Sequence, residues 1–368
     1  MVVHIIGAGL AGLSAAVHLT RQGVPVALYE AAAHAGGRCR SFFDSKTQAE
    51  LDNGTHLFMG ANHALFSLLE ICGGRPDAFV DEGTKIPFFN MKTKKFFQIN
   101  LAHPLLSIFK AKRVLPLVVK SIMNTPKDQA DMRMAFKTLC KCVQKDGNRV
   151  YLAKKSLNDA VIDPIVSYLR KNGAAIHFGH RLKAAYEEEL VFFNKTVPLE
   201  KDDMVILALP APALSKYVRD INEYATNTIL NIHYKSNAVL KNGRSYAGLL
   251  HSSRADFVFV RNGVVSITVS AADALLAQYS PDMLAGLIWQ DLAKVLVEPE
   301  KRPPYRVVVN KRATPVQTAE FNAGRPQTDI GDYVIFLASD FVQTGLPCTM
   351  ESAVVAGMKA AQAVIDGL

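Results

Sequence analysis

The sequence lacks any continuous apolar run of the roughly 18 residues that a membrane-spanning helix requires. Cysteines are few, odd in number and without a CxxC pair, which argues against a disulfide framework or a zinc site and indicates a reducing compartment. They are Cys39, Cys72, Cys140, Cys142 and Cys348. We therefore expect a cytoplasmic protein that is soluble or lies on the inner face of a membrane without crossing it, and we expect no metal site.

Signals for secretion and for nucleic-acid binding are missing as well. The apolar start Val2–Gly12 has no basic region before it, and its glycine pattern predicts a buried strand and turn, not a signal peptide. No basic block is interleaved with aromatic residues as in nucleic-acid modules. The net charge of +9 nevertheless suits either a solvated basic surface, an anionic membrane or a polyphosphate cofactor. The 368 residues suggest two domains.

A glycine motif at the N-terminus predicts a dinucleotide site. The apolar run Val2–Ile6 has the character of a buried parallel strand, and Leu13–Arg21 repeats apolar residues at helical spacing. Between them, Gly7 permits a tight turn, Gly9 lets the backbone approach a pyrophosphate, and Gly12 lets the helix pack on the strand. The start of the helix also offers free N–H groups to phosphates.

The next segment favours FAD over a nicotinamide cofactor. The second strand, Val24–Tyr29, leads to Glu30, whose carboxylate is placed to accept hydrogen bonds from both hydroxyls of a ribose. Small residues then lead to Gly36, Gly37 and Arg38. Two glycines permit another close backbone approach, and an arginine can neutralise a phosphate with its forked donors. A nicotinamide enzyme does not need this second phosphate contact.

The C-terminal part predicts the other side of the same site. The strand Tyr333–Ala338 is followed by Asp340, and Met350–Ile365 has helical spacing. An acid at the end of a strand can hydrogen-bond a ribityl hydroxyl, and a helix that begins near Met350 would point its positive end at the flavin pyrimidine. We therefore predict a doubly wound α/β fold: a Rossmann-type FAD-binding domain formed by residues 1–82, 143–214 and 306–368, and a discontinuous α+β substrate domain formed by residues 83–142 and 215–305.

Several motifs together resemble the amine oxidase and phytoene desaturase superfamily of flavoproteins: GAGLAGLSAA, Glu30 and Gly36-Gly37-Arg38. Further segments resemble one branch of it, the hydroxysqualene dehydroxylase family. These are Asp52-Asn53-Gly54-Thr55-His56, Met123-Asn124-Thr125-Pro126, Lys311–Thr318 with Arg325-Pro326, and Thr344–Pro347 with Glu351–Ala353. The resemblance runs in order over nearly the whole chain. The family has glycine where this chain has Ser339, a side chain large enough to crowd the ribityl chain, and alanine where it has Cys348.

The resemblance implies an FAD-dependent oxidoreductase of hopanoid precursor synthesis, in which reduced flavin replaces the hydroxyl of hydroxysqualene by hydrogen. The hydroxyl has to be protonated or hydrogen-bonded to leave as water. His56 is the candidate acid, and its alternative role is a histidine that bonds the backbone or the flavin. Asp52 is more readily explained as a turn-stabilising acid, and His4 as a packed core residue. The expected cofactor-binding residues are Gly7, Gly9, Leu10, Ala11, Gly12, Glu30, Gly36, Gly37, Arg38, Gly54, Leu182, Asp340, Thr349 and Met350.

The segment Leu101–Met123 predicts one or two amphipathic helices, broken near Pro116. One interpretation is a buried helix of the substrate domain. The other is an entrance for a lipophilic isoprenoid substrate, with the apolar residues in the lipid. Four basic residues would then meet anionic head groups, and they are Lys110, Lys112, Arg113 and Lys120.

Three rival functions stay open at this point. A carotenoid-type or squalene desaturase would use the same cofactor and tunnel but run electrons from substrate to flavin. An amine oxidase would need an aromatic cage beside the flavin, whereas the aromatic residues of the segment 305–349 are only Tyr305, Phe321, Tyr333, Phe336 and Phe341. A non-catalytic isoprenoid-binding protein is the third. The electron donor is left open.

Overall fold

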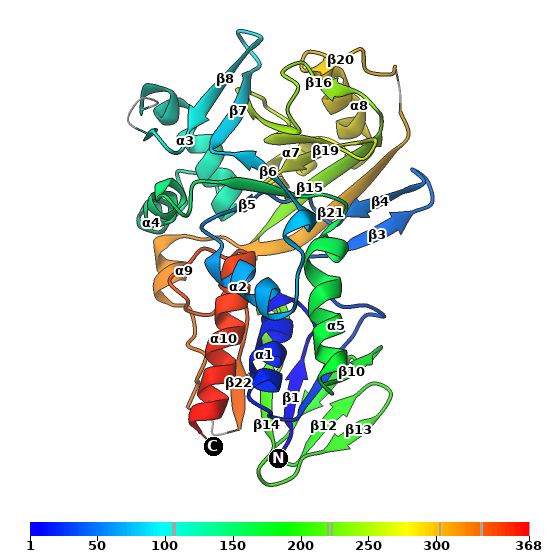
Figure 1. Cartoon of the computed structure of the whole chain (residues 1–368), viewed down its shortest axis with the longest axis vertical. Helices are drawn as coiled ribbons and strands as arrows, with labels where there is room; N and C mark the ends of the chain where they lie inside the picture. Colours follow the sequence, from blue (N-terminus) through cyan, green and yellow to red (C-terminus); the bar gives the residue numbers. More distant parts are fainter. Residues whose placement is uncertain (105–107, 219–220, 222–223, 302, 332–333, 368) are drawn as a thin grey trace.

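The computed structural model describes residues 1–104, 108–218, 221, 224–301, 303–331 and 334–367. It is elongated, with a parallel sheet and its helices at one end and a larger, mostly antiparallel sheet at the other (Figure 1). Both chain termini lie at the end that holds the parallel sheet (Figure 1). The chain passes between the two ends several times, because each sheet is built from segments that are far apart in the sequence.

The parallel sheet confirms the doubly wound α/β prediction. Its order is β10-β2-β1-β14-β22, and all four strand pairs are parallel. The strands are β1 (Val3–Ile6), β2 (Val26–Glu30), β10 (Ala175–Phe178), β14 (Met204–Leu207) and β22 (Ile335–Leu337). The last of these was predicted to start at Tyr333, a residue that lies outside the described part of the chain.

Side-chain alternation along each strand sends residues to two different cores. Val3 and Ile5 pack with helices on one face, and Ile6 packs on the other face with a small antiparallel sheet. The helices are α1 (Leu10–Arg21), α2 (His63–Ile71), α5 (Asp163–Lys171) and α10 (Met350–Asp366), and the small sheet comprises β11 (Leu182–Ala185), β12 (Glu189–Phe192) and β13 (Thr196–Pro198). Both faces of the parallel sheet are therefore covered, as its apolar strands require.

The larger sheet has the order β21-β15-β19-β18-β17-β7-β8. Its strands are β7 (Lys85–Asn90), β8 (Lys95–Asn100), β15 (Thr226–Lys235), β17 (Tyr246–Leu250), β18 (Phe257–Arg261), β19 (Val264–Val269) and β21 (Tyr305–Pro315). The hairpin predicted at residues 86–99 is confirmed as β7 and β8. Helix α8 (Pro281–Leu292) packs Leu284, Ile288 and Trp289 into the core of this sheet.

One predicted boundary cuts through a continuous strand. The FAD-binding part was expected to resume at residue 306, but β21 pairs with β15 from Tyr305 to Pro315. Residues 306–315 therefore belong to the larger sheet, and the end of β21 contacts the N-terminal part of the chain where Arg38 donates to the carbonyl of Ala313. The residues of β21 mix apolar and charged side chains, and this pattern could not show which sheet supplies the partner strand.

Helix α3 (Ile108–Met123) decides between the one or two helices that were predicted for this segment. It continues through Pro116 without a break, and α4 (Met132–Val143) follows it. Proline removes one backbone hydrogen bond and usually kinks a helix, but Pro116 and Lys112 both lie on the exposed face. Water can therefore satisfy the carbonyl that loses its partner. The segment 105–107, part of the predicted Leu101–Met123 segment, lies outside the described residues.

The remaining elements are short. They are β3 (Ser41–Asp44), β4 (Ala49–Asp52), β5 (Phe58–Met59), β6 (Phe79–Gly83), β9 (Val150–Ala153), α6 (Ala211–Leu214), β16 (Val239–Leu240), α7 (Asp273–Gln278), β20 (Leu296–Val297), α9 (Ala319–Ala323), a 3₁₀ turn (Pro76–Ala78) and a π-helical turn (Asn158–Ile162) that leads into α5. Within the described ranges, no helix is both long enough and apolar enough to span a bilayer.

Candidate cofactor and active site

The first glycine turn has the shape of a phosphate cradle. Gly7 has a φ of +109°, and a Cβ there would lie 2.4 Å from the carbonyl oxygen of Ala208. A Cβ on Gly12 would lie 1.9 Å from the carbonyl oxygen of Gly7, so helix and strand touch at this point. By contrast, a Cβ on Gly9 would meet nothing within 4 Å. The turn is therefore tight on both sides and open at Gly9.

Free donors point out of this opening. Gly9 is the N-cap of α1, and no side chain caps the helix. The N–H groups of the first turn of a helix, here those of Leu10, Ala11 and Gly12, have no partner within the helix. Together with the helix dipole they suit an anion such as a pyrophosphate.

Glu30 lies beside the same turn. Its Oε2 accepts a hydrogen bond from the backbone N–H of Ala8 at 2.8 Å, and its Oε1 accepts one from Ala32 at 2.8 Å. These two bonds hold the carboxylate at the end of β2. Each oxygen keeps a further lone pair, so the carboxylate can still accept hydrogen bonds from a ribose.

The second glycine pair packs against the first turn. Gly36 donates its N–H to the carbonyl of Ala8 at 2.8 Å, and Gly36 and Gly37 have φ values of +105° and +56°. A Cβ on Gly37 would lie 3.3 Å from the Cα of Gly9. Two glycine-rich turns therefore face each other across a narrow space, which fits the two close backbone approaches predicted for FAD.

Arg38 and Asp340 connect the two ends of the chain. Nη2 of Arg38 donates to Oδ1 of Asp340 at 2.6 Å, and Nη1 donates to the carbonyl of Ala313 at 2.6 Å. Asp340 is buried, whereas the Arg38 side chain is 45% exposed. Ser339, predicted to crowd the cofactor, is buried and donates its hydroxyl to Oδ1 of Asp340 at 3.2 Å.

Four further predicted cofactor residues lie outside the two glycine turns. Thr349 is the N-cap of α10 and accepts a hydrogen bond from the N–H of Ser352, so Met350 opens the helix as expected. Gly54 faces Asn231. A Cβ placed on Gly54 would lie 3.1 Å from Nδ2 of Asn231. Leu182 is buried in the core that covers the other face of the parallel sheet.

The residues fit an FAD molecule. Two glycine turns, a free helix start, a carboxylate at the end of β2 and a second carboxylate at Asp340 all lie along the carboxyl edge of the parallel sheet. In open α/β sheets this edge is where nucleotide cofactors bind. The fit rests on the glycine turn and its unpaired donors: a side chain at Gly7 or Gly12 would clash with the backbone that forms the turn, and the turn is open at Gly9.

His56 does not have the properties of a ready proton donor. Its Nδ1 lies 2.6 Å from the carbonyl oxygen of Gly54, which makes Nδ1 the protonated nitrogen of the neutral ring. Burial lowers the pKa of His56. A neutral ring with this tautomer presents Nε2 as an acceptor. The geometry thus favours the alternative role, a histidine that bonds the backbone.

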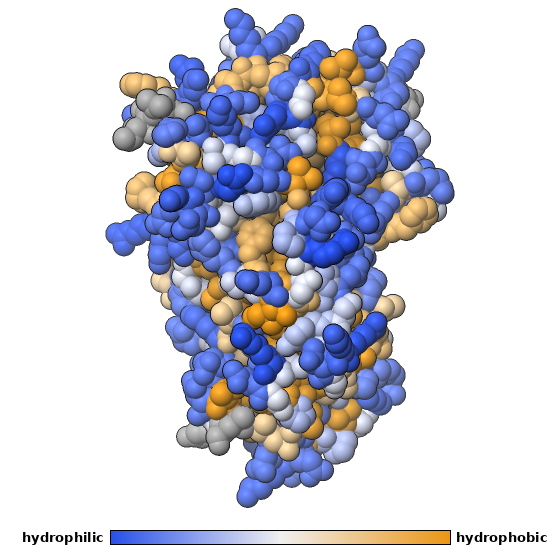
Figure 2. Space-filling view, viewed as in Figure 1, coloured by the Kyte–Doolittle hydropathy of each residue, from blue (hydrophilic) through white to orange (hydrophobic). Residues whose placement is uncertain are grey.

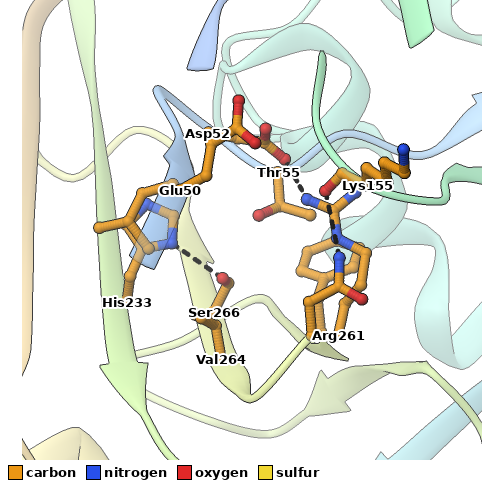
Figure 3. A pocket seen from close by; sticks show the side chains of 11 residues that line it. Glu50, Asp52, Thr55, Lys155, His233, Arg261, Val264 and Ser266 are labelled. Atoms are coloured by element: carbon orange, nitrogen blue, oxygen red, sulfur yellow. Dashed lines mark hydrogen bonds and ion pairs between the residues drawn. The ribbon is translucent and has the colours of Figure 1, made fainter. Parts of the chain in front are cut away.

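Asp52 is a structural acid, and Figure 3 shows its contact with Arg261. Its carboxylate accepts hydrogen bonds from the hydroxyl of Ser41 at 2.7 Å, from the N–H of Leu157 at 3.1 Å and from Nη2 of Arg261 at 2.5 Å. It therefore fixes the turn that carries Asn53, Gly54 and His56.

A small cavity of about 20 Å³ lies next to this ion pair. His233 lines it and forms a 2.8 Å hydrogen bond between Nδ1 and the hydroxyl of Ser266 (Figure 3). Burial lowers the pKa of His233 to about 4. The cavity has room for a single water, not for a substrate.

His4 is a core residue with polar partners. Its Nε2 lies 3.2 Å from Oδ2 of Asp203, and its Nδ1 lies 3.4 Å from the hydroxyl of Tyr29. The cysteines are all free, and burial raises the pKa of Cys348 and of Cys39 to about 12. These two thiols are therefore protonated near neutral pH, and among the described residues no group of side chains suits a metal ion.

Gln317 was overlooked as a functional residue, although it lies in a segment that carried the family resemblance. It is fully buried. Its Nε2 donates to the carbonyl of Met123 at 2.5 Å, its Oε1 accepts from the N–H of Cys348 at 2.7 Å, and its own N–H donates to the hydroxyl of Thr125 at 3.0 Å. Its carbonyl accepts from Asp131, the N-cap of α4. Gln317 thus joins α3, α4 and the start of α10.

Arg325 was also overlooked. Its guanidinium is buried and donates to the carbonyl oxygens of the loop that follows β22. The only signal in the sequence was its place in the Arg-Pro pair of the family resemblance. A buried arginine cannot be told from a solvated one by residue type alone.

Comparison with known proteins agrees with this geometry. A model for the NAD(P)-binding Rossmann-like domain matches residues 5–71, and one for flavin containing amine oxidoreductases matches residues 162–365. A hydroxysqualene dehydroxylase of Zymomonas mobilis is 32% identical over 99% of this chain and 99% of that protein. A hydroxysqualene dehydroxylase of Sinorhizobium fredii is 28% identical over 99% and 98%. An oxidoreductase structure from Methanosarcina mazei shares the fold, with a TM-score of 0.76 at 14% identity over 98% of this chain and 100% of that one.

Proposed function

Because the chain belongs to the flavin containing amine oxidoreductase family, and within it to the hydroxysqualene dehydroxylases, we propose that it converts hydroxysqualene to squalene as an FAD-dependent oxidoreductase. The observation that carries this proposal is the full-length match to a dehydroxylase, on a chain whose two ends come into contact through Arg38 and Asp340. Reduced FAD would supply the hydride that replaces the hydroxyl; the hydroxyl would leave as water with a proton from the reduced cofactor or from solvent, and the FAD would end oxidised. The substrate is a lipophilic isoprenoid.

We assign the cofactor to the residues along the edge of the parallel sheet. The glycine turns and the start of α1 would hold the pyrophosphate, Glu30 the ribose, and Asp340 the ribityl chain. Arg38 lies between the two ends of the site and can contact either a phosphate or Asp340. The start of α10, at Thr349 and Met350, would face the pyrimidine. Gly54 and Leu182 complete the set predicted from the sequence.

His56 is proposed to orient the substrate hydroxyl and not to protonate it. Its Nε2 is an acceptor in the tautomer that Gly54 fixes. Replacing His56 with Asn keeps a polar side chain and removes any proton transfer through the ring. Loss of turnover by more than about a hundredfold, with FAD binding intact, would restore the role of general acid.

A lipid substrate needs an entrance, and we propose that α3 and α4 contact an anionic membrane surface. The two helices expose Phe109 and Phe136, whose side chains are 80% and 68% exposed. Basic side chains surround them; those that are exposed are Lys110, Lys112, Arg113, Arg133 and Lys137. Figure 2 shows apolar side chains between hydrophilic ones along the edge of the molecule where Figure 1 places α3 and α4. Aromatic and basic residues in this mixture are typical of interfacial helices.

Lys120 has to be removed from the predicted set of membrane contacts. Its Nζ lies 3.0 Å from Oδ1 of the buried carboxylate of Asp256. Releasing it to a lipid head group would leave that carboxylate buried without its cation, which is costly. Helix α4 supplies Arg133 and Lys137 in its place.

The experiment that tests the reaction uses purified protein with FAD, an excess of dithionite and hydroxysqualene in detergent, under nitrogen. We expect squalene, identified by mass spectrometry, in amounts above the enzyme concentration. A conjugated polyene formed by oxidised enzyme would support a desaturase instead. Hydrogen peroxide released on adding amines would support an amine oxidase, and a protein that binds isoprenoid without turnover would be a non-catalytic relative.

A further inference from the structure

Arg325 holds the loop that carries the C-terminal part of the cofactor site. It follows α9, and its side chain is 4% exposed. Its guanidinium donates to four backbone carbonyls: Nε to Phe341 at 2.8 Å, Nη1 to Leu346 at 2.5 Å, and Nη2 to Asp340 at 2.7 Å and Val342 at 2.6 Å. The loop from Asp340 to Leu346 is therefore wrapped around one side chain.

No carboxylate neutralises this cation. Within the described part of the chain, Arg325 forms no ion pair: of Asp340 it contacts only the backbone carbonyl, and the carboxylate of Asp340 is paired with Arg38. Glu351 lies in the first turn of α10, but its oxygens accept hydrogen bonds from Ala64 and Leu65 at the start of α2.

What balances the charge of Arg325 is the set of carbonyl dipoles and the ring of Phe321, whose centroid lies 5.9 Å from Cζ. Carbonyl dipoles and an aromatic ring stabilise a cation without cancelling its charge. The positive charge therefore acts at a distance in a region of low dielectric constant, where charges interact far more strongly than in water.

We propose that Arg325 is a positioning residue that also favours the reduced state of the bound flavin. Reduction builds negative charge on the flavin pyrimidine, and this is the part of the cofactor assigned to the start of α10. An arginine keeps its charge at every accessible pH. This inference rests on the FAD assignment made above. It adds an electrostatic role that a purely structural loop clamp would not have.

The test compares the affinity for oxidised FAD with the affinity for reduced FAD in the same protein. Apoprotein is titrated with each form under nitrogen, for wild type, Arg325→Gln and Arg325→Lys. If Arg325 acts through its charge, Arg325→Gln weakens binding of reduced FAD about tenfold more than binding of oxidised FAD. This difference in affinity corresponds to about 1.4 kcal/mol. Arg170→Gln, which removes an exposed arginine of α5, is the matched control for net charge.

An equal loss of affinity for both forms in Arg325→Gln would overturn the inference and leave only a structural clamp. Failure of the wild type to bind FAD at all would overturn the proposed function itself, and the two results are distinct.

Arg325→Lys provides a second test, which holds even if Arg325→Gln fails to fold. A buried lysine loses its proton more easily than an arginine. The ratio of the two affinities should therefore stay near that of wild type at pH 7 and shift against reduced FAD as the pH rises towards 10. Wild type measured over the same range corrects for the titration of the flavin itself. A ratio in Arg325→Lys that follows wild type at every pH would contradict the inference.

Discussion

Arg38 and Asp340 are separated by 302 residues, yet Nη2 of the arginine donates to Oδ1 of the aspartate at 2.6 Å. The sequence predicts each of them as a cofactor residue for a separate reason, one from the second glycine motif and the other from the end of a strand. Their contact brings the N-terminal and C-terminal parts of the chain together at the proposed cofactor site. A half-exposed ion pair contributes little stability of its own, about 1 kcal/mol or less. The pair is therefore best explained by its place in the cofactor site.

We predict that Arg38→Gln and Asp340→Asn each weaken FAD binding about tenfold, because each removes a charged hydrogen-bonding group from the site. The double variant should lose less than the product of the two single effects, since either change alone already breaks the pair. Titration calorimetry of the apoproteins with FAD measures all four constants. Arg149→Gln, which breaks the exposed pair with Asp81, is the control. Fully multiplicative losses would show that the two residues act independently.

Gly357, in the middle of α10, should not tolerate a larger residue. A Cβ there would lie 2.2 Å from the carbonyl oxygen of Ala11 and 2.7 Å from the Cβ of Ser14, both in α1. Because the neighbours are backbone and a short side chain, Gly357→Ala has to push α10 away from α1. We expect a loss of about 2–3 kcal/mol in the free energy of unfolding, together with weaker FAD binding.

The control for this prediction is Gly286→Ala in α8, where a Cβ meets nothing within 4 Å. That change should stabilise the protein by about 0.5–1 kcal/mol, because alanine restricts the unfolded chain. Urea unfolding of both variants provides the measurement. Equal stability of the two variants would mean that α1 and α10 are not in such close contact.

The lowered pKa of His233 predicts that the folded protein loses stability in acid. Burial lowers its pKa from 6.5 to about 4 in the folded protein, so below pH 6.5 the unfolded chain binds the proton more readily. The stabilisation is complete above pH 6.5 and declines as the pH falls towards 4. At pH 5 the loss should be about 2 kcal/mol, from 1.36 kcal/mol for each pKa unit.

His233→Gln should therefore flatten the dependence of unfolding free energy on pH between 7 and 5, even if it lowers stability throughout. Other histidines with lowered pKa values, His56 and His177, contribute the slope that remains. The same change at exposed His103 is the control. An unaltered slope in His233→Gln would show that this histidine is not the group that titrates.

Liposome binding should depend on the exposed basic residues of α3. We expect the triple change Lys110→Glu, Lys112→Glu and Arg113→Glu to abolish sedimentation with vesicles that contain anionic lipid. The control variant replaces Lys92, Lys94 and Lys95 on the β7–β8 hairpin with glutamate. It alters the net charge by the same amount and should leave vesicle binding intact. Equal loss of binding in both variants would indicate attraction through overall charge, without a defined face.

The ends of the chain could be predicted well because their chemistry is local. A glycine turn between an apolar strand and an amphipathic helix leaves few alternatives, and the parallel sheet with Gly7, Gly9 and Gly12 at its edge confirms that prediction. The resemblance over the whole chain then indicated the family. The hairpin at residues 86–99 was equally local, with two strands and a polar turn.

What could not be predicted depends on distant partners. Nothing near Lys120 shows that its charge is taken by Asp256, and nothing near Arg325 shows that four carbonyls surround it. The segment around Pro116 left one helix or two open, because the exposure of that face cannot be read from the segment alone. Likewise, the sequence of β21 does not show which sheet the strand joins until its pairing with β15 is known.

The most direct test of the central claim is a single turnover in heavy water. The flavin of the purified protein is photoreduced under nitrogen in D₂O, hydroxysqualene is added in detergent, and both the flavin spectrum and the extracted lipid are followed. We predict that the flavin becomes oxidised while about one squalene forms for each FAD, and that this squalene carries one deuterium, because the hydrogen on the reduced flavin exchanges with solvent. A flavin that stays reduced, or squalene without deuterium, would contradict hydride transfer from the flavin to this substrate.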